Sequence, residues 1–430
     1  MTLRNVSLVS MMFTLGLAGA CGGTTVDAPV QPTSDTDAGT TQPVADSAPP
    51  DDPLNTTYPG AHAPIPLVDF NGGKIMTAPK IVTVTFDGDP MRDRLEAFGD
   101  IITATPWWDA VSAGYCNKGG TPCIGRGTAG EHVHLPAGAT SYTDSSQGKP
   151  SSIQQFIADQ VAAGTFPAPT VNTLYAIYFA DGVSIDLDGS GSCSSFGAYH
   201  NTLALTSPAG DGGVDGGGGP QVITPYAIMP RCSPSEAETT ISASHEFIEA
   251  ATDPDIGVND VAYYMNDQLW AFAGGEVGDV CVDFTGQGAD QYQESGFTVQ
   301  RSWSNKAAKA SHDPCVPATP GEAYYNVAPK AGSEQITLNA VGQSKTIMLD
   351  AFSDGPMDDW TVSAIDFASF QGGSPSLGFK FDKTLAHNGS HIALTITLKS
   401  KPRAGYAQYA IVSKAAGKQT RDWPAVVLTQ

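Results

Sequence analysis

Hydrophobic residues follow two different patterns along this chain, and the change falls near residue 319. Between residues 59 and 318, short apolar runs alternate with stretches in which apolar residues recur every three or four positions. The runs predict strands and the periodic stretches predict helices. We expect strands at 80–86, 174–179, 203–205 and 222–228, and helices at 91–113 (broken at Pro106) and 151–163. Such alternation predicts an α/β or α+β domain.

Two of the expected strands carry further information. The run at 174–179 is apolar at every position, which is typical of a central strand covered on both faces. The run at 222–228 contains Pro225, which has no N–H to donate to a neighbouring strand. We therefore expect the second run at an edge of the sheet.

Residues 319–430 show short alternating runs separated by turn residues, and no helical pattern interrupts them. The runs lie at 336–341, 345–349, 360–362, 377–381, 392–398, 407–412 and 425–428. This pattern predicts an all-β, immunoglobulin-like sandwich. The region holds no catalytic constellation, so we interpret it as an accessory or adhesion module.

The N-terminus has the pattern of an export signal. Arg4 precedes an apolar run at 9–17, and small residues at 18–20 lead to Cys21. We expect a lipoprotein signal peptide over 1–21, with Cys21 as the lipid-bearing residue; ordinary cleavage near Ala20 is the alternative. Residues 22–58 are rich in Thr, Pro, Ala and Asp, which predicts a disordered linker. The protein would then be an exported lipoprotein, anchored to the outer or cell-surface membrane of a bacterium.

Net charge limits the possible partners, and the cysteine count agrees with export. The chain has 22 basic and 44 acidic residues, a net charge of −22, which argues against nucleic acid or an anionic membrane surface as partner. Contact with a membrane would come only through the anchor. Six cysteines remain beyond Cys21, and an even number in an exported chain predicts disulfides. Six cysteines allow fifteen pairings; their order favours Cys116–Cys123, Cys193–Cys232 and Cys281–Cys315.

The strongest chemical signal lies in a third helix of the first region. Ser233 and Pro234, followed by acidic residues, predict its start, and Asp253 before Pro254 predicts its end near Ala251. On this helix His245 and Glu249 are one turn apart and share a face. A His and a carboxylate so placed can bind a metal, with Glu246 as general base. The alternative is a solvated amphipathic helix that carries the pattern by chance.

The pattern is that of the H-E-x-x-H helix of zinc peptidases, with Glu249 in place of the second His. In gluzincin peptidases a third ligand, Glu, follows on another helix, and Glu276 has a suitable position in this chain. Glycines at 274, 275 and 278 argue against a helix there. The alternative is a loop pinned by Cys281 and hydrogen-bonded to the helix end.

Three more residues are candidates for the second shell or for alternative ligands: Asp279, His200 and Asp253. A Cys193–Cys232 bridge would bring His200 towards His245. The sequence context gives no ligand role to other histidines, among them His132 and His134. A ligand set of one His and two carboxylates suits zinc. Because most of its ligand atoms are oxygens, Mn²⁺ and Ca²⁺ are alternative ions.

A separate segment suggests calcium. Asp186, Asp188 and Ser190 place oxygen ligands at alternate positions, as at the front of a calcium loop. The segment lacks the closing Glu of an EF-hand, because Gly197 stands at that position. The alternative is a plain β-turn.

Together these motifs resemble the EXORDIUM-like, phosphate-induced protein 1 family over roughly residues 75–317. The resemblance rests on the motifs Trp107-Trp108, Gly197-Ala198-Tyr199-His200, Ser244-His245-Glu246, Thr252-Asp253-Pro254 and the cysteines and acids that follow. Plant members are secreted cell-wall proteins linked to growth, and bacterial relatives are exported proteins of unknown activity. The resemblance implies that the His-Glu-x-x-Glu pattern and the later Glu276 and Asp279 form the family's site. The calcium segment and the C-terminal sandwich fall outside it.

The leading hypothesis is a zincin-like core with a zinc-dependent, metallopeptidase-like hydrolase site. Its substrate would be a peptide or a cell-surface polymer. The second hypothesis is a non-enzymatic cell-surface or cell-wall binding module, in which the same residues form a structural metal site or a hydrogen-bond network. The two differ in openness, because a catalytic metal keeps a free position beside a cleft.

Overall fold

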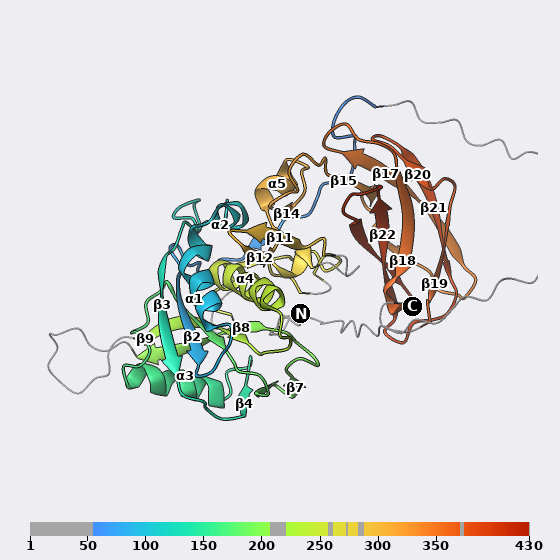
Figure 1. The fold of residues 1–430 in the computed structure, drawn as a ribbon. Coiled ribbons are helices and arrows are strands. Elements are labelled where there is room, and N and C mark those ends of the chain that lie inside the picture. The colour runs from blue at the N-terminus through green and yellow to red at the C-terminus, as the bar shows by residue number, and fades with distance from the viewer. Residues whose placement is uncertain are drawn as a thin grey trace, which may run out of the picture.

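The structure is a computed structural model that describes residues 55–206, 221–256, 261–271, 274–282, 288–369 and 374–429. The predicted signal peptide, Cys21 and residues 22–54 of the predicted linker lie outside these residues. The described chain is mostly β with few helices, and it forms two bodies side by side (Figure 1). Among the described helices, none has the length and apolar character needed to cross a bilayer.

The first body is built on a five-stranded sheet in the order β3-β2-β5-β9-β8. These strands are β2 (Lys80–Phe86), β3 (Thr128–Leu135), β5 (Thr173–Tyr178), β8 (Tyr199–Thr206) and β9 (Gln221–Met229). The first four strands in the sheet order are parallel, and β8 runs antiparallel at one edge. All four strands expected from the sequence are present.

Helices cover both faces of this sheet (Figure 1). On β5, Leu174 and Ala176 join the apolar core that also contains residues of α1 (Arg92–Ile101) and α4 (Glu236–Thr252). Tyr175 and Ile177 point the other way, into a core shared with α3 (Ser152–Ala162). This alternation confirms the prediction that 174–179 is a central strand covered on both faces.

The prediction for β9 was wrong, because this strand lies between β5 and β8 rather than at an edge. Pro225 is tolerated there for a local reason. Pairing with β5 begins only at Tyr226, so the part of β9 up to Pro225 pairs with β8 alone. A proline can occupy such a position, because one side of the backbone is free of a partner strand.

Two helix boundaries differ from the sequence prediction. The helix expected over 91–113 is divided into α1, a 3-10 turn at Ile102–Ala104, and α2 (Pro106–Val111), which Thr105 caps by accepting from Trp108 N. Helix α4 begins at Glu236, later than expected. The side chain of Ser235 accepts from Glu238 N and caps the helix, so the helix starts after the position that Ser233 and Pro234 predicted.

Smaller elements complete the first body. They are β1 (Asp69–Phe70), β4 (Ser141–Asp144), β6 (Ser184–Leu187), β7 (Ser190–Gly191), β10 (Tyr263–Tyr264), β11 (Gln291–Glu294), β12 (Phe297–Gln300), β13 (Ser302–Trp303), β14 (Cys315–Val316), α5 (Asn305–Lys309) and a 3-10 turn at Asp279–Cys281. All three expected disulfides are formed: Cys116–Cys123, Cys193–Cys232 and Cys281–Cys315.

The second body consists of a four-stranded and a five-stranded sheet, in the orders β15-β17-β21-β19 and β16-β23-β22-β18-β20. Its strands are β15 (Tyr325–Pro329), β16 (Gln335–Thr337), β17 (Ser344–Ser353), β18 (Trp360–Asp366), β19 (Leu377–Phe381), β20 (Leu385–Ala386), β21 (His391–Leu398), β22 (Tyr406–Lys414) and β23 (Arg421–Leu428), with a 3-10 turn at Phe367–Ser369. The seven expected runs all contain strands. The sequence analysis missed β15, which is buried at every position and does not alternate, and the two-residue β20.

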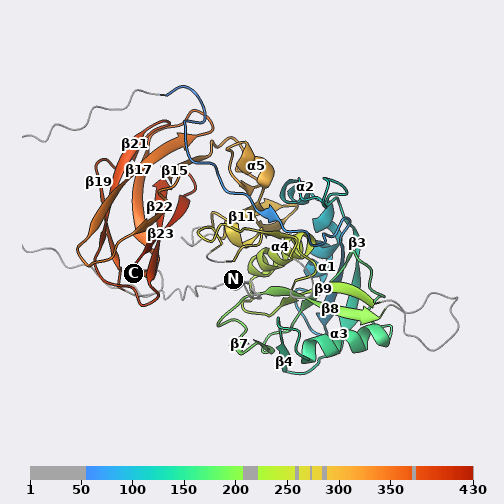
Figure 2. The ribbon, with the colours of Figure 1, turned by 180° about the vertical axis from the view of Figure 1, so that it is seen from behind.

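The N-terminal segment of the described chain lies along the second body before it enters the first (Figure 2). The Asn388 side chain donates to the carbonyl oxygens of Asn55 (3.0 Å) and Thr57 (2.8 Å) and accepts from Gly60 N (2.7 Å). The predicted linker extends to residue 58, but its last residues are held on the sandwich. The first body is therefore connected to the sandwich by chain at both of its ends.

A buried ionic group joins the two bodies. Arg301 and Arg421 both contact the carboxylate of Asp313, and Arg301 also donates to Gln419 Oε1 at 2.6 Å. Trp270 packs edge-to-face on Trp303 of the first body and on Trp423 of the sandwich. The two bodies thus share polar and aromatic contacts.

Candidate metal centre

Six ionisable side chains meet between β8, α4 and the segment 274–282. His245, Glu246 and Glu249 come from α4, His200 comes from β8, and Glu276 and Asp279 come from the segment. None of the six is more than 5% exposed. We call these six residues the buried cluster.

Strand alternation directs His200 into this cluster. Its neighbours Tyr199 and Asn201 point to the opposite face of β8, where the buried carboxylate of Asp144 accepts from Tyr199 Oη at 2.8 Å and from Tyr226 Oη at 2.7 Å. Successive side chains of a strand point to opposite faces, so His200 faces α4. The Cys193–Cys232 disulfide also ties the chain before β8 to the chain before α4, as expected.

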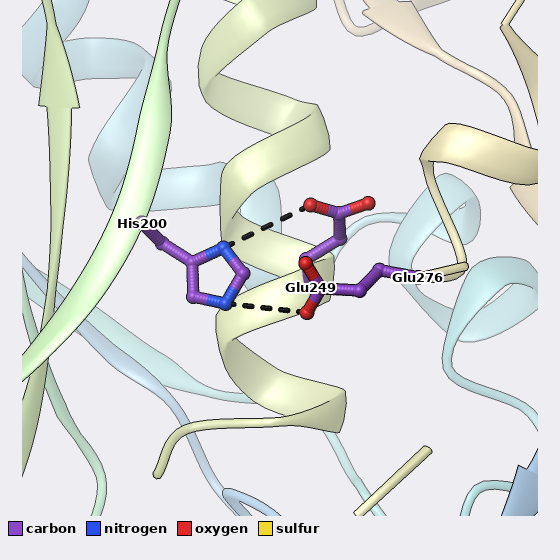
Figure 3. Close-up of side chains that lie close together, drawn as sticks. All are labelled: His200, Glu249 and Glu276. Atoms are coloured by element: carbon purple, nitrogen blue, oxygen red, sulfur yellow. Dashed lines mark ion pairs between the residues drawn. The ribbon is translucent and has the colours of Figure 1, made fainter. Parts of the chain in front are cut away.

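His200 contacts carboxylates from two directions. Its Nδ1 lies 3.2 Å from Glu246 Oε2 and 3.8 Å from Glu249 Oε2. Its Nε2 lies 3.4 Å from Glu276 Oε1. Figure 3 shows the His200 ring facing Glu249 and Glu276, with one ring nitrogen joined to each carboxylate. Both ring nitrogens are therefore committed to acidic neighbours.

His245 faces a second set of carboxylates. Its Nε2 lies 3.0 Å from Glu249 Oε2, 3.6 Å from Asp279 Oδ1 and 4.0 Å from Glu246 Oε1. The i and i+4 pair of the sequence prediction is thus in direct contact. Glu249 belongs to both sets of contacts and is the centre of the cluster.

Gln300 fixes the tautomer of His245. The Gln300 amide Nε2 donates to the carbonyl oxygen of Gly278 at 2.8 Å, so its Oε1 is the acceptor facing His245 Nδ1 at 3.0 Å. Nδ1 of His245 therefore carries the proton, and Nε2 faces the carboxylates as a potential ligand. The sequence analysis missed Gln300, because nothing in its local pattern marks it.

The donor atoms fall into two groups that each suit a metal ion. Ligand atoms of His200, Glu249 and Glu276 lie within 4.8 Å of one another, and so do those of His245, Glu249 and Asp279. The predicted set of His245, Glu249 and Glu276 is thus divided between two groups. His200 and Asp279, which were predicted as second-shell residues or alternative ligands, are among the potential ligands.

The hydrogen bonding of the cluster fits a cation. Glu249 Oε1 accepts from the backbone N–H of Gly278 and of Asp279, both at 3.1 Å, which leaves Oε2 facing the two imidazoles. Among the described residues, His200 Nε2 and Glu246 Oε1 are buried and make no hydrogen bond. Buried polar atoms normally have partners, and nitrogen and carboxylate oxygen are zinc ligands. The residues present therefore fit a divalent metal ion.

The charges of the cluster shift its pKa values. Burial alone lowers the pKa of His200, but Glu276 and Glu246 outweigh it and raise this pKa to about 10. Burial also lowers the pKa of His245, while Glu249 and Glu246 raise it well above its ordinary value. Burial raises the pKa of Glu276 well above its usual range. The metal-free cluster holds protons that a metal ion would displace.

Two other predicted sites have different surroundings. Asp253 caps the C-terminal end of α4 and accepts from Ala262 N at 3.0 Å, and burial raises its pKa to about 6. Asp188 accepts from Ser145 Oγ and from Ser146 N and Oγ, and Asp186 accepts from Gly189 N. Ser190 lies in β7. The segment from Asp186 to Gly191 is therefore a β-hairpin turn, the alternative to a calcium loop, and its Asp188 carboxylate is bonded to the chain that follows β4.

Gly278 permits the close approach of its segment to α4. A Cβ at this position would lie 2.6 Å from His245 Nδ1 and 2.8 Å from Glu249 Oε1, too close for either atom to stay in place. Residues 274–282 form the loop that we gave as the alternative to a helix. Cys281 is bonded to Cys315, and the backbone N–H groups of Gly278 and Asp279 donate to Glu249.

We expect Gly278→Ala to displace the ligands and weaken zinc binding by on the order of 10- to 100-fold, the range for groups that orient ligands. Overpacking should also lower stability by about 1–3 kcal/mol. Zinc titration calorimetry and urea unfolding would measure both effects. Gly355→Ala is the control, since a Cβ there makes ordinary contact with Ala323 at 3.5 Å. Equal zinc affinity in both variants would contradict this assignment of Gly278.

Comparisons with known proteins add little. No family model and no curated protein matches the chain. Similar solved structures include a Bacteroides ovatus GH5 xyloglucanase with a XXXG heptasaccharide (14% identity, 24% of this chain and 19% of that chain, TM-score 0.17). They also include the BIgI domain of beta protein from S. agalactiae bound to CEACAM1 (13% identity, 25% and 97%, TM-score 0.17) and a mutant complex of titin M10 with an obscurin-like 1 Ig domain (14% identity, 25% and 92%, TM-score 0.16). These TM-scores are too low to support an argument.

Proposed function

We propose that the first body is a zincin-like, zinc-dependent hydrolase that acts on peptide bonds. The observation that carries this proposal is the position of Glu246. Its carboxylate lies between the two imidazoles, 3.2 Å from His200 Nδ1 and 4.0 Å from His245 Nε2, beside the shared ligand Glu249. A base next to the ligand set is the arrangement that metal-assisted hydrolysis needs.

We assign the metal to His245, Glu249 and Asp279. His245 presents Nε2 because Gln300 holds the proton on Nδ1, and Glu249 presents Oε2 because two backbone N–H groups occupy Oε1. One neutral imidazole and two carboxylates would balance the charge of a divalent ion. Zinc in such a site supplies a Lewis acid that polarises a carbonyl group and lowers the pKa of water.

The remaining residues of the cluster, His200 and Glu276, would hold the general base Glu246 in position. Glu246 holds His200 Nδ1 through Oε2, and His200 reaches Glu276 through Nε2. This Glu246–His200–Glu276 chain fixes the Glu246 carboxylate. Its Oε1 makes no hydrogen bond among the described residues, so it is placed to take a proton from an attacking water.

Substrate would approach from the junction of the two bodies. A cavity of about 110 Å³ lies there, lined on one side by Asp279 and Trp303 and on the other by Tyr324 and Arg421 of the sandwich region. Asp279 thus belongs both to the ligand set and to the cavity wall. The sandwich would then shape the approach to the metal rather than act as a separate module.

The variant Glu246→Gln tests the proposed reaction. The zinc-loaded protein should cleave fluorescently labelled casein, and the variant should be slower by about 10²- to 10⁴-fold, the usual contribution of a general base. Its zinc content should equal that of wild type, because Glu246 is not in the assigned ligand set. Equal activity in the two proteins, or no cleavage by either, would exclude the peptidase proposal.

Burial favours a second candidate function. Every member of the cluster is at most 5% exposed, as in closed, structural metal sites. A non-enzymatic surface module with a structural metal ion would show a higher melting temperature with zinc and no hydrolysis. The same casein assay and a melting curve therefore separate the two functions.

We also propose that the protein is exported and lipid-anchored through Cys21 and belongs to the EXORDIUM-like family. The three disulfides support export, since such bonds persist mainly in oxidising compartments. The family assignment rests on the sequence motifs, which supply all six residues of the buried cluster.

A further inference from the structure

A second group of potential metal ligands lies on the surface, where α1 packs on β3. Glu96 and Asp100 are one turn apart on α1, and His132 and His134 occupy alternate, outward positions of β3. Residues one turn apart on a helix share a face, as do alternate residues of a strand. We call these four residues the surface cluster; none of them belongs to the buried cluster.

Every member of the surface cluster touches another member. His132 Nδ1 lies 3.4 Å from Glu96 Oε2, and His132 Nε2 lies 3.0 Å from Asp100 Oδ1. His134 Nε2 contacts Glu96 Oε1. Glu96 therefore lies between the two rings, with one oxygen directed at each.

Two glycines allow this close packing of helix on strand. A Cβ on Gly99 of α1 would lie 2.3 Å from Thr83 Oγ1 of β2. A Cβ on Gly130 of β3 would lie 2.8 Å from the carbonyl oxygen of Ile81 and 3.4 Å from Asp100 Oδ1. Without side chains at these positions, α1 can bring its carboxylates within reach of the histidines.

We propose that His132, His134 and Glu96 bind a second divalent transition-metal ion, with zinc the best match to the donor set. Two imidazoles and one carboxylate bind zinc in some enzymes and iron(II) in others, and in both cases they leave coordination positions open. Atoms bonded to one tetrahedral zinc ion lie about 3.3 Å apart, given bonds of about 2.0–2.1 Å. The 3.4 Å contact between His132 Nδ1 and Glu96 Oε2 has this spacing and is long for a hydrogen bond.

Asp100 has a positioning role in this proposal. It contacts the second nitrogen of His132, so it would accept the Nε2 proton while Nδ1 binds the ion. Carboxylate–histidine–metal chains of this kind set the tautomer and orientation of the ligand. The two carboxylates, with neutral imidazoles, balance a charge of +2.

The side chains would have to move to bind one ion, because ligand atoms of His132, His134 and Glu96 do not all lie within 4.8 Å of one another; among the described residues only the two groups of the buried cluster show that spacing. The His132 and His134 side chains are 33% and 46% exposed, so their rings can turn without disturbing the core. The same exposure gives the ion access to water. This site is thus open, in contrast to the buried cluster.

The test is a count of bound zinc on the full chain, first stripped with chelator and then titrated with Zn²⁺. The double variant His132→Ala/His134→Ala should bind one equivalent less than wild type, and Asp100→Asn should raise the Kd of that equivalent by about 10- to 100-fold. His312→Ala is the control, because His312 is an exposed histidine 2.8 Å from a single carboxylate, Asp354. It should lose nothing.

The outcomes separate this site from the buried one. A double variant that binds zinc in the same number and with the same Kd as wild type would overturn the proposal. So would a Glu249→Gln variant that binds no zinc at all, because the surface cluster would still be intact in it. Both sites would be supported if Glu249→Gln and the double variant each lost one bound zinc ion and the two lost ions differed in Kd.

Discussion

Glu249→Gln is expected to abolish metal binding at the proposed site in the buried cluster while the protein stays folded. Glu249 is the one residue common to both ligand groups, so neither group keeps its full set of ligands without it. Glutamine keeps an oxygen that can accept from the N–H groups of Gly278 and Asp279, which protects the local fold. Affinity for zinc should fall by at least about 100-fold, the upper range for disturbing a ligand environment. Mass spectrometry of bound zinc, with circular dichroism for the fold, would measure the effect.

Three further variants make this experiment specific. Glu238→Ala, an exposed carboxylate of the same helix, should keep its zinc. Asp279→Asn should lose the ion and Glu276→Gln should retain it, if the ligand set is the one proposed. The reverse result would assign the ion to His200, Glu249 and Glu276 instead. Full zinc content in Glu249→Gln would exclude the buried metal centre.

Asp313→Asn should produce the largest loss of stability. Asp313 is 4% exposed and neutralises both Arg301, which is 1% exposed, and Arg421. Burial lowers the pKa of Arg301, and Asp313 opposes that shift, as expected for an ion pair held out of water. Removing the charge leaves the buried guanidinium of Arg301 and the partly buried one of Arg421 without their carboxylate, and breaking a buried pair in this way costs about 3–5 kcal/mol.

Urea unfolding of wild type and Asp313→Asn would measure that loss. The control is Asp109→Asn, which removes an exposed carboxylate from its pair with Arg126 and should change stability little. Because Asp313 joins the two bodies, the variant should also unfold them in separate transitions. A stability equal to that of the control would show that water already screens the Arg301 and Arg421 charges.

Local patterns in the sequence were sufficient for much of the fold. The continuous apolar run at 174–179 predicted a strand covered on both faces, and β5 is such a strand. Alternating runs predicted most strands of the sandwich, because one face of each is buried. The spacing of His245 and Glu249 predicted their contact, since helical geometry alone brings them together.

The same local reasoning failed where the position or role of a residue depends on a partner far away in the sequence. Pro225 is tolerated inside the sheet because β5 begins to pair only at the next residue, which the sequence of β9 does not reveal. Gln300 orients His245 across 55 residues, and Asp144 holds Tyr199 across the same separation. Neither residue carries a local signal of its role.

The sequence by itself determined the elements and the helix that carries the metal-binding pattern, because these depend on neighbours within one or two turns. Only the tertiary structure decided which ligands meet. It placed His200 and Asp279 beside Glu249, and it brought Glu96 to His132 and His134, which had no partner in sequence. The physical reason is that the side chains of a ligand set come from separate elements. Sheet order, strand alternation and the close approach of the backbone at glycine residues determine which of them lie together.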